Sequence, residues 1–322
     1  MTICVIIAAW NAERTISRAI ASALAQPEVA EVLVVDDAST DATIAAAEAA
    51  DDGSGRLTVL RQDRNGGPSA ARNRALAVSE ADYVAVLDAD DYLLPGRFTA
   101  LLAIPGWDAI ADNIAFVPEA RDDLAVPPPI DAGDYPARTL TLGALLAGSI
   151  SRRTAPRGEL GFLKPVIRRA FLDANGLRYD EALRLGEDFA LYTRLLAAGA
   201  RFLTIARCGY VAVERRASLS GSHATGDLAA LLGAVDSWAA GARLDPSDRA
   251  ALARYRAQLS ANYRHRRLLD DKRQMGLPRA LFRLLDEPLT VPRVALRVLS
   301  DKLAPPGVAP APASAVRYLL PR

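Results

Sequence analysis

Short apolar runs alternate with segments of helical periodicity over residues 1–87, and this alternation restricts the chain to few folds. The runs are rich in β-branched residues, and the segments between them repeat apolar residues at helical spacing. Strands are predicted at 3–9, 32–35, 57–60 and 83–87, and helices between them at 15–24, 42–50 and 69–78. Because the strands are apolar throughout, both faces of the sheet must be covered. The sequence therefore predicts an α/β fold with a mostly parallel sheet.

Polar residues follow three of these predicted strands at the point where each strand ends. They are Trp10-Asn11, Asp36-Asp37 and the cluster Asp88–Asp91. In open α/β sheets, ligands bind outside the carboxyl ends of the strands. Packing alone does not explain polar residues that recur at this edge, so we predict a ligand site there.

Beyond residue 100 the pattern is less regular. A stretch rich in Pro and Asp at 118–136 indicates a loop or linker. Further predicted elements are a helix at 140–147, a strand and then a helix within 162–171, a helix from Glu187 to 198, and a last strand at 201–205. From Asp227 onward the pattern is helical, and an Ala- and Pro-rich stretch at 304–315 is expected to be extended or disordered.

The carboxyl-terminal third is basic as well as helical. Residues 249–302 contain 13 Arg and Lys against 5 Asp and Glu. One interpretation is peripheral attachment to an anionic membrane surface, since Arg293, Arg297 and Lys302 flank apolar residues. The other is a helical face that packs on the rest of the chain or on a second subunit, as in a homodimer. We divide the chain into a first domain at 1–222 and a helical carboxyl-terminal region at 223–322.

Composition excludes several classes of protein. The net charge of +1 over 322 residues gives no sign of nucleic-acid binding. Cys4 and Cys208 are too few for a disulfide framework or a zinc site, which favours a reducing cytoplasm. No run of about 18 apolar residues occurs, so the protein is expected to be cytoplasmic, or peripheral at the inner face of the plasma membrane.

The cluster Asp88-Ala89-Asp90-Asp91 contains three carboxylates at the end of an apolar strand. Such carboxylates repel one another unless a cation or hydrogen bonds offset the repulsion. Mg²⁺ and Mn²⁺ prefer oxygen ligands and often share them with substrate phosphates. Two alternatives remain at this point: a solvated turn whose Asp caps a helix before Leu93, and an aspartyl nucleophile of a phosphatase-like enzyme.

Five segments in one order carry a resemblance to a known family. They are Val5–Asn11 (VIIAAWN), Val34–Asp41 (VVDDASTD), Asn65–Asn73 (NGGPSAARN), Val86–Asp91 (VLDADD) and Gly186–Asp188 (GED). The chain resembles family 2 glycosyltransferases of the GT-A fold over residues 1–205. Among members of the family, it is similar to the small bacterial enzymes that build exopolysaccharide repeat units.

The resemblance implies a nucleotide-sugar donor site. Ala8, Ala9 and Trp10 would line the base, with Trp10 as a flat stacking surface and Asn11 as a supporting residue. The family usually has Pro or a hydroxyl residue near Ala8 and Ala9, so one contact is lost here. Asp37 would accept a hydrogen bond from the base, with Asp36 beside it. The alternative is that both acids only cap a helix.

Further donor contacts are implied along the chain. Arg72 would lie near the donor diphosphate at a helix start, although it could also be a surface residue in a local ion pair. Asp88 would contact the ribose and Asp90 would ligate the divalent cation, Mn²⁺ or Mg²⁺. Asp91 would support either of them or cap the following helix.

The resemblance also implies the general base. A sugar hydroxyl is a poor nucleophile, and a carboxylate within hydrogen-bond reach can remove its proton. The family's base corresponds to Asp188, with Glu187 beside it; the alternative is ordinary acids at a helix start. Arg216 and His223 lie in a loop that would close over the diphosphate or simply remain mobile.

Together these implications describe an inverting hexosyltransferase. It would transfer a sugar, glucose by family frequency, from a UDP-sugar to a hydroxyl of a saccharide or lipid-linked acceptor in exopolysaccharide synthesis. Two other functions remain open: a non-catalytic partner in a polysaccharide-assembly complex, and a metal-dependent phosphohydrolase with Asp88 as its nucleophile.

Overall fold

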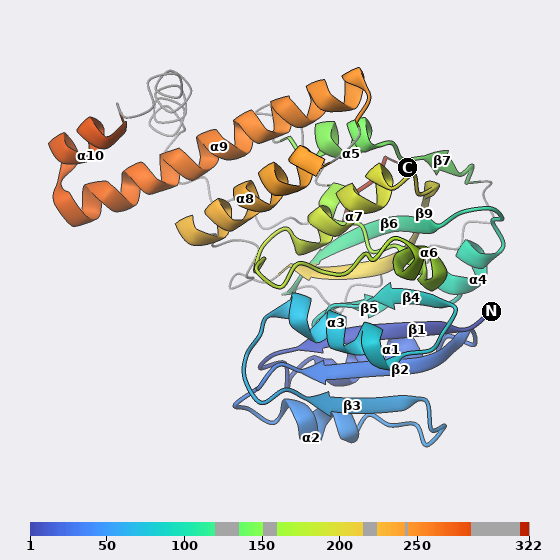
Figure 1. The fold of residues 1–322 in the computed structure, drawn as a ribbon. Coiled ribbons are helices and arrows are strands. Elements are labelled where there is room, and N and C mark those ends of the chain that lie inside the picture. The colour runs from blue at the N-terminus through green and yellow to red at the C-terminus, as the bar shows by residue number, and fades with distance from the viewer. Residues whose placement is uncertain (120–134, 151–159, 215–223, 242–243, 285–315, 322) are drawn as a thin grey trace. The chain divides into compact units, whose positions relative to one another are not determined.

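Figure 1 shows the computed structural model of the chain, which describes residues 1–119, 135–150, 160–214, 224–241, 244–284 and 316–321. The chain divides into two compact units. One consists of Met1–Arg216 with Ala315–Arg322, and the other of Ala217–Ser314. The last eight residues therefore belong to the first unit, whereas the sequence placed them in the helical carboxyl-terminal region.

The first unit begins with the seven elements that the sequence predicts, in the predicted order. They are β1 (Ile3–Ala9), α1 (Ile16–Leu24), β2 (Val29–Asp36), α2 (Thr43–Glu48), β3 (Leu57–Arg61), α3 (Pro68–Val78) and β4 (Tyr83–Val86). Strands β3, β2, β1 and β4 lie side by side in that order, and each neighbouring pair is parallel (Figure 1). The predicted parallel arrangement is confirmed for these strands.

The order of the strands creates a switch point between β1 and β4. The chain moves outward from β1 to β2 and β3, and then returns to place β4 on the other side of β1. The register pairs Ala9 with Asp36 and Ile6 with Val86, so the polar residues after β1, β2 and β4 meet at one edge of the sheet. A crevice at such a point is the general ligand site of open α/β sheets.

Local sequence explains these elements. The predicted helical spacing on α1 is confirmed, because its five apolar residues Ile16, Ala19, Ile20, Ala23 and Leu24 are all buried. Helix α3 begins with Pro68, which is well suited to a first helical position. Gly67 precedes it with a φ of +84°, a conformation that other residues rarely adopt.

The second half of this unit extends the sheet with a mixed set of strands. Its elements are β5 (Tyr92–Leu93), α4 (Arg97–Leu102), β6 (Ala109–Pro118), β7 (Arg138–Thr139), α5 (Leu142–Gly148), the 3-10 helix η2 (Leu160–Phe162), β8 (Val166–Arg168), α6 (Arg169–Ala174), α7 (Glu187–Ala197), β9 (Phe202–Glu214) and β10 (Arg317–Tyr318). After β4 the sheet continues with β8, β6, β9 and β5. Strand β8 is antiparallel to both its neighbours, whereas β6 and β9 are parallel.

Several strands differ from the prediction: the short strands β5, β7 and β10 were not predicted, and the two long strands β6 and β9 differ as well. Strand β6 was not predicted, because Asp112 and Asn113 interrupt its apolar residues; both are buried and hydrogen-bonded. Strand β9 extends to Glu214, well past the predicted end at residue 205, and it is not the last strand, because β10 pairs with β6. The predicted loop at 118–136 and the stretch at 304–315 lie mostly or wholly outside the described residues.

The second unit is helical where it is described. It contains α8 (Thr225–Gly241), α9 (Pro246–Met275) and α10 (Leu277–Leu284). Asp245 caps α9 by accepting hydrogen bonds from the backbone N–H groups of Ser247 and Asp248, and Pro246 occupies the first helical position. Helix α8 packs on α9, and Arg256 of α9 forms an ion pair with Asp236 of α8. Within the described parts of the chain, no helix is long and apolar enough to cross a membrane.

Candidate active site

The edge at the switch point begins with the residues that follow β1. Ala8 and Ala9 end the strand, and the Trp10 side chain is 51% exposed at this edge. Asn11 adopts a φ of +50° and joins this loop to the loop after β2. Its backbone N–H donates to Ser39 Oγ at 2.9 Å, and its Oδ1 accepts from the Thr40 N–H at 2.9 Å. Asn11 therefore supports the two loops.

Asp37 holds the glycine turn that precedes α3. Its buried carboxylate accepts hydrogen bonds from Gln62 Nε2 at 2.7 Å and from the N–H groups of Gly66 and Gly67 at 2.7 and 2.8 Å. In Asp36, Oδ2 accepts from the Ser39 N–H, while the buried Oδ1 has no hydrogen-bond partner. Neither acid caps α2, whose cap position is Ala42. The helix-capping alternative is therefore not what the structure shows.

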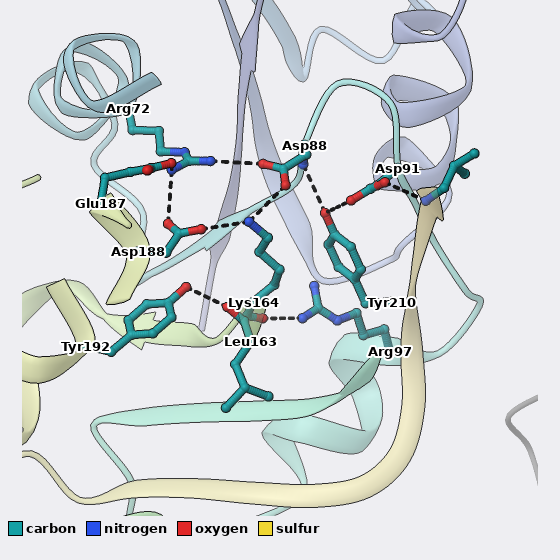
Figure 2. A network of polar contacts seen from close by, with 11 residues as sticks. Arg72, Asp88, Asp91, Arg97, Leu163, Lys164, Glu187, Asp188, Tyr192 and Tyr210 are labelled. Carbon is teal, nitrogen blue, oxygen red and sulfur yellow. Dashed lines mark hydrogen bonds and ion pairs between the residues drawn. The ribbon is translucent and has the colours of Figure 1, made fainter. Parts of the chain in front are cut away.

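Arg72 lies at the centre of a network of ion pairs (Figure 2). It is the fifth residue of α3 and is only 3% exposed, so it is not a surface residue. Its guanidinium group donates to Asp88 Oδ1 at 2.9 Å, Glu187 Oε1 at 2.9 Å and Asp188 Oδ1 at 3.0 Å. The buried arginine thus joins the end of β4 to the start of α7.

A glycine turn places the two acids of α7, Glu187 and Asp188, in this network. Gly186 has a φ of +72°, which turns the chain sharply into the helix. Glu187 and Asp188 then occupy the first turn, where the helix dipole favours negative charge. Asp188 is buried and faces two cations, so it is not an ordinary solvated acid at a helix start.

Lys164 is the second cation of the network, and the sequence did not reveal it. Its Nζ lies 2.9 Å from Asp88 Oδ2 and 2.7 Å from Asp188 Oδ2, and the residue is 6% exposed. The one available signal was its rarity, because the chain contains only three lysines and this one stands in the apolar run 160–167. Arg72 and Lys164 therefore bridge the same two carboxylates.

These contacts control the charge at the end of β4. Burial favours the neutral form of Asp88, but Lys164 and Arg72 outweigh it and lower the pKa of this carboxyl to about 2. Burial opposes the charged form of Lys164, but Asp188 and Asp88 raise its pKa above the usual value. Burial and the nearby charge of Asp188 raise the pKa of Glu187.

Asp91 links the acidic cluster to β9 by two hydrogen bonds. Its Oδ2 accepts from the Tyr210 hydroxyl at 2.7 Å, and its Oδ1 accepts from the Val213 N–H at 2.9 Å. The Tyr210 hydroxyl also accepts a hydrogen bond from the Asp88 N–H at 3.1 Å (Figure 2). Burial, together with the charges of Asp88 and Asp90, raises the pKa of Asp91. Asp91 caps no helix, because β5 is the next element.

Asp90 is half-buried in the same turn, which is anchored by a hydrogen bond from Arg18 Nη2 to the Asp90 carbonyl at 3.2 Å. Among the residues that the structure describes, no three metal-ligating side chains come together. A divalent cation that also binds a diphosphate needs only one or two protein carboxylates. The donor set therefore fits a cation shared with substrate phosphates rather than one enclosed by protein. Arg216 and His223 lie outside the described residues.

Comparison with known proteins agrees with this geometry. The model of the family described as Glycosyl transferase family 2 matches residues 4–120. The chain is 50% identical to the succinoglycan biosynthesis protein ExoU of Rhizobium meliloti (strain 1021), over 99% of this chain and 95% of that protein.

Solved structures of GT-A glycosyltransferases have the same fold. That of S. aureus TarS 1–349 in complex with UDP-GlcNAc has a TM-score of 0.60 and 22% identity, covering 83% of this chain and 73% of that one. Mannosyltransferase PcManGT from Pyrobaculum calidifontis, in complex with GDP-Man and Mn²⁺, has a TM-score of 0.55 and 21% identity, covering 94% of this chain and 80% of that one. The predicted GT-A fold is confirmed.

Proposed function

The chain belongs to glycosyltransferase family 2, and on that premise we propose that it is an inverting, metal-dependent hexosyltransferase of bacterial exopolysaccharide synthesis. The proposed donor is a UDP-sugar, with UDP-glucose the first to test, and the proposed acceptor is a hydroxyl of a lipid-linked saccharide. The similarity to ExoU, a succinoglycan biosynthesis protein, supports a role in polysaccharide synthesis. The TarS structure with UDP-GlcNAc supports a UDP-sugar as donor.

The observation that carries the proposal is the ring of ion pairs that Asp88, Arg72, Asp188 and Lys164 form. Asp88 stands at the carboxyl end of β4, on the edge where nucleotides bind in such folds. Asp188 stands at the start of α7 and contacts the same two cations. A carboxylate suited to deprotonate an acceptor is thus linked directly to the donor edge.

In the proposed reaction the acceptor hydroxyl attacks the anomeric carbon from the face opposite the leaving group. A new C–O bond forms, the bond from the anomeric carbon to the diphosphate oxygen breaks, and Asp188 takes the hydroxyl proton. Such general-base assistance is worth ~10²–10⁴ in rate. Trp10 offers an exposed ring to the base.

The leaving diphosphate needs positive charge nearby. A divalent cation held by Asp90 and the donor phosphates would neutralise it, and Arg72 adds a fixed guanidinium charge in the same region. Family membership favours sugar transfer over the phosphohydrolase alternative. The remaining alternative is a non-catalytic partner in polysaccharide assembly.

The test measures UDP release from UDP-glucose and other UDP-sugars, with Mn²⁺ and lipid-linked saccharides extracted from an exopolysaccharide-producing bacterium. We expect acceptor-dependent release by the wild type and a loss of at least a hundredfold in Asp188→Asn. Asp173→Asn, a change in an exposed acid of α6, serves as the matched control and should keep full activity. A folded wild type without transfer from any donor would favour the non-catalytic partner, and an active Asp188→Asn would remove Asp188 from the base role.

The second unit supports a peripheral membrane contact as part of the proposal. Leu277, Leu281 and Phe282 of α10 are exposed, Phe282 at 74%, and the exposed Arg279 lies among them. Apolar side chains mixed with cations suit the surface of an anionic bilayer.

Sedimentation with phosphatidylglycerol-containing vesicles tests the membrane contact. Phe282→Asp should reduce binding at least fivefold, whereas Val78→Asp, at an apolar residue of α3 that is 51% exposed, should not. Equal binding by both variants would contradict it. Concentration-dependent self-association that Phe282→Asp abolishes would instead assign this surface to a second subunit.

A further inference from the structure

Lys164 belongs to the network but has no part in the proposed reaction. Its ammonium group lies between two carboxylates, 2.7 Å from Asp188 and 2.9 Å from Asp88 (Figure 2). Arg72 already bridges the same pair from the other side. Moving a second cation out of water is costly, so we ask what Lys164 does besides neutralising a carboxylate that Arg72 already contacts.

The backbone that presents Lys164 is held in place by buried side chains. The Tyr192 hydroxyl donates to the Leu163 carbonyl at 2.7 Å, and Arg97 Nη2 donates to the Lys164 carbonyl at 2.5 Å (Figure 2). Tyr192 lies one turn after Asp188 on α7, so the helix that carries the acid also holds the chain that carries the lysine. Pro165 follows and restricts the Lys164 backbone to extended conformations.

Arg97 is itself anchored. It is fully buried and donates through Nε and Nη2 to Asp112 of β6, at 3.0 and 2.9 Å. The Lys164 carbonyl is thus fixed to α4 and β6, and the Leu163 carbonyl is fixed to α7. The lysine therefore has little freedom to move away from the two carboxylates.

We propose that Lys164 is a positioning residue, which orients the Asp188 carboxylate toward the acceptor and ties it to Asp88 at the donor edge. The inference rests on the proposed role of Asp188 as the general base. Lys164 acts through that carboxylate and takes no proton itself. Arg72 holds Oδ1 of Asp188 and Lys164 holds Oδ2, so the two cations together fix the plane of the carboxylate.

The charges around Asp188 accompany these geometric constraints, because a guanidinium group and an ammonium group each lie within hydrogen-bond distance of one of its oxygens. The charged or titratable groups around Asp188 are Arg72, Lys164, Glu187, Asp88, Tyr179 and Tyr192.

The experiment compares Lys164→Met, Lys164→Gln and Lys164→Arg with the wild type, using UDP-glucose, Mn²⁺ and the lipid-linked saccharide extract. We expect kcat to fall at least thirtyfold in the Met and Gln variants with KM little changed, because the lost contact acts on the chemical step. Lys164→Arg keeps the charge and should recover part of kcat. Lys272→Met, which removes an exposed lysine of α9, is the control and should match the wild type.

Two further variants separate positioning from folding. Tyr192→Phe removes the hydrogen bond to the Leu163 carbonyl but no charge, so kcat should fall about fivefold with KM unchanged. In an Asp188→Asn background, Lys164→Met should cause no further loss, because residues that act as one unit are not additive. Thermal unfolding checks that each variant is folded. If Lys164→Met does not fold, Lys164→Gln takes its place in these comparisons.

The results for Lys164 and Asp188 can fail separately. If Asp188→Asn is inactive but folded Lys164 variants keep the wild-type kcat, the positioning role is wrong and the base assignment stands. Full additivity of the two substitutions would also overturn the positioning role. If Asp188→Asn is active, both fail, because Lys164 then has no base to position.

Discussion

Individual residues in the candidate active site depend on their partners. Asp88 has a pKa of about 2 although it is half-buried, because Lys164 and Arg72 outweigh the cost of burial. Removing one partner of such a buried network typically costs 3–5 kcal/mol, since the other charges remain without compensation. The same ion pairs therefore contribute to the stability of the fold and to the chemistry of the site.

The pKa of Cys4 is shifted by burial rather than by ion pairs. Burial outweighs the contacts that stabilise the thiolate, and it raises the pKa of the thiol to about 12. Because the pKa of Cys4 is higher in the folded protein than in the unfolded chain, its contribution to the free energy of unfolding is fully present below about pH 9. That contribution is lost as the pH rises toward 12. The neutral thiol is a poor nucleophile.

We expect iodoacetamide at pH 8.5 to label neither Cys4 nor the equally buried Cys208 in the native protein within an hour, as read by intact mass. Both thiols should react in urea, which serves as the control. Rapid labelling of native Cys4 would contradict the assigned burial.

At the scale of elements, Gly209 of β9 lies directly against the buried ion pair that Arg97 of α4 forms with Asp112 of β6. A Cβ at Gly209 would lie 2.3 Å from Asp112 Oδ2 and 2.6 Å from Arg97 Cγ, too close for any side chain. Glycine is therefore required there for space, since the Arg97–Asp112 pair cannot move without breaking its hydrogen bonds.

Gly209→Ala should lower the free energy of unfolding by ~1–3 kcal/mol or more, the usual cost of overpacking. The control is Gly233→Ala on α8, where nothing lies within 4 Å of the added Cβ, and alanine should be neutral or stabilising there. Urea denaturation measures both. Equal stability of the two variants would show that β9 does not pass so close to the pair.

The elements also show what could be predicted from sequence. The alternation of buried runs and amphipathic helices predicted β1 to β4 because local periodicity decides those elements. Strand β6 could not be predicted in the same way, because its polar Asp112 and Asn113 are hydrogen-bonded to residues distant in the sequence, namely Arg97, Ala206 and Leu320. Lys164 was missed for a similar reason: its partners Asp88 and Asp188 meet it only in the fold.

At the scale of the whole molecule, the end of the chain belongs to the first unit. Asn113 of β6 donates to the Leu320 carbonyl at 2.9 Å and accepts from the Leu320 N–H at 2.6 Å. Arg317 of β10 forms an ion pair with Glu214 of β9 at 2.7 Å, and its guanidinium carbon lies 3.9 Å from the ring centroid of Phe116. A segment remote in sequence therefore completes the sheet.

Deleting residues 315–322 should destabilise the first unit although the deletion removes no predicted site residue. The buried Asn113 amide loses both hydrogen bonds to Leu320 while it keeps those to Ala206 and Ile114, so each lost bond should cost ~0.5–1.5 kcal/mol. Thermal unfolding should show a lower melting temperature, with Arg317→Ala giving a smaller decrease. An unchanged melting temperature would mean that β10 contributes nothing to the sheet.

The central claim is a nucleotide-sugar site at the switch point, with Asp90 as ligand of a divalent cation. Thermal shift with UDP, with and without Mn²⁺, tests it most directly on the wild type, Asp90→Ala and the control Asp173→Ala. A ligand at 100 times its Kd stabilises by ~2.7 kcal/mol. We predict stabilisation of the wild type and the control by UDP only with Mn²⁺, and its loss in Asp90→Ala. Absence of any shift in the wild type with UDP or another nucleoside diphosphate would contradict the account.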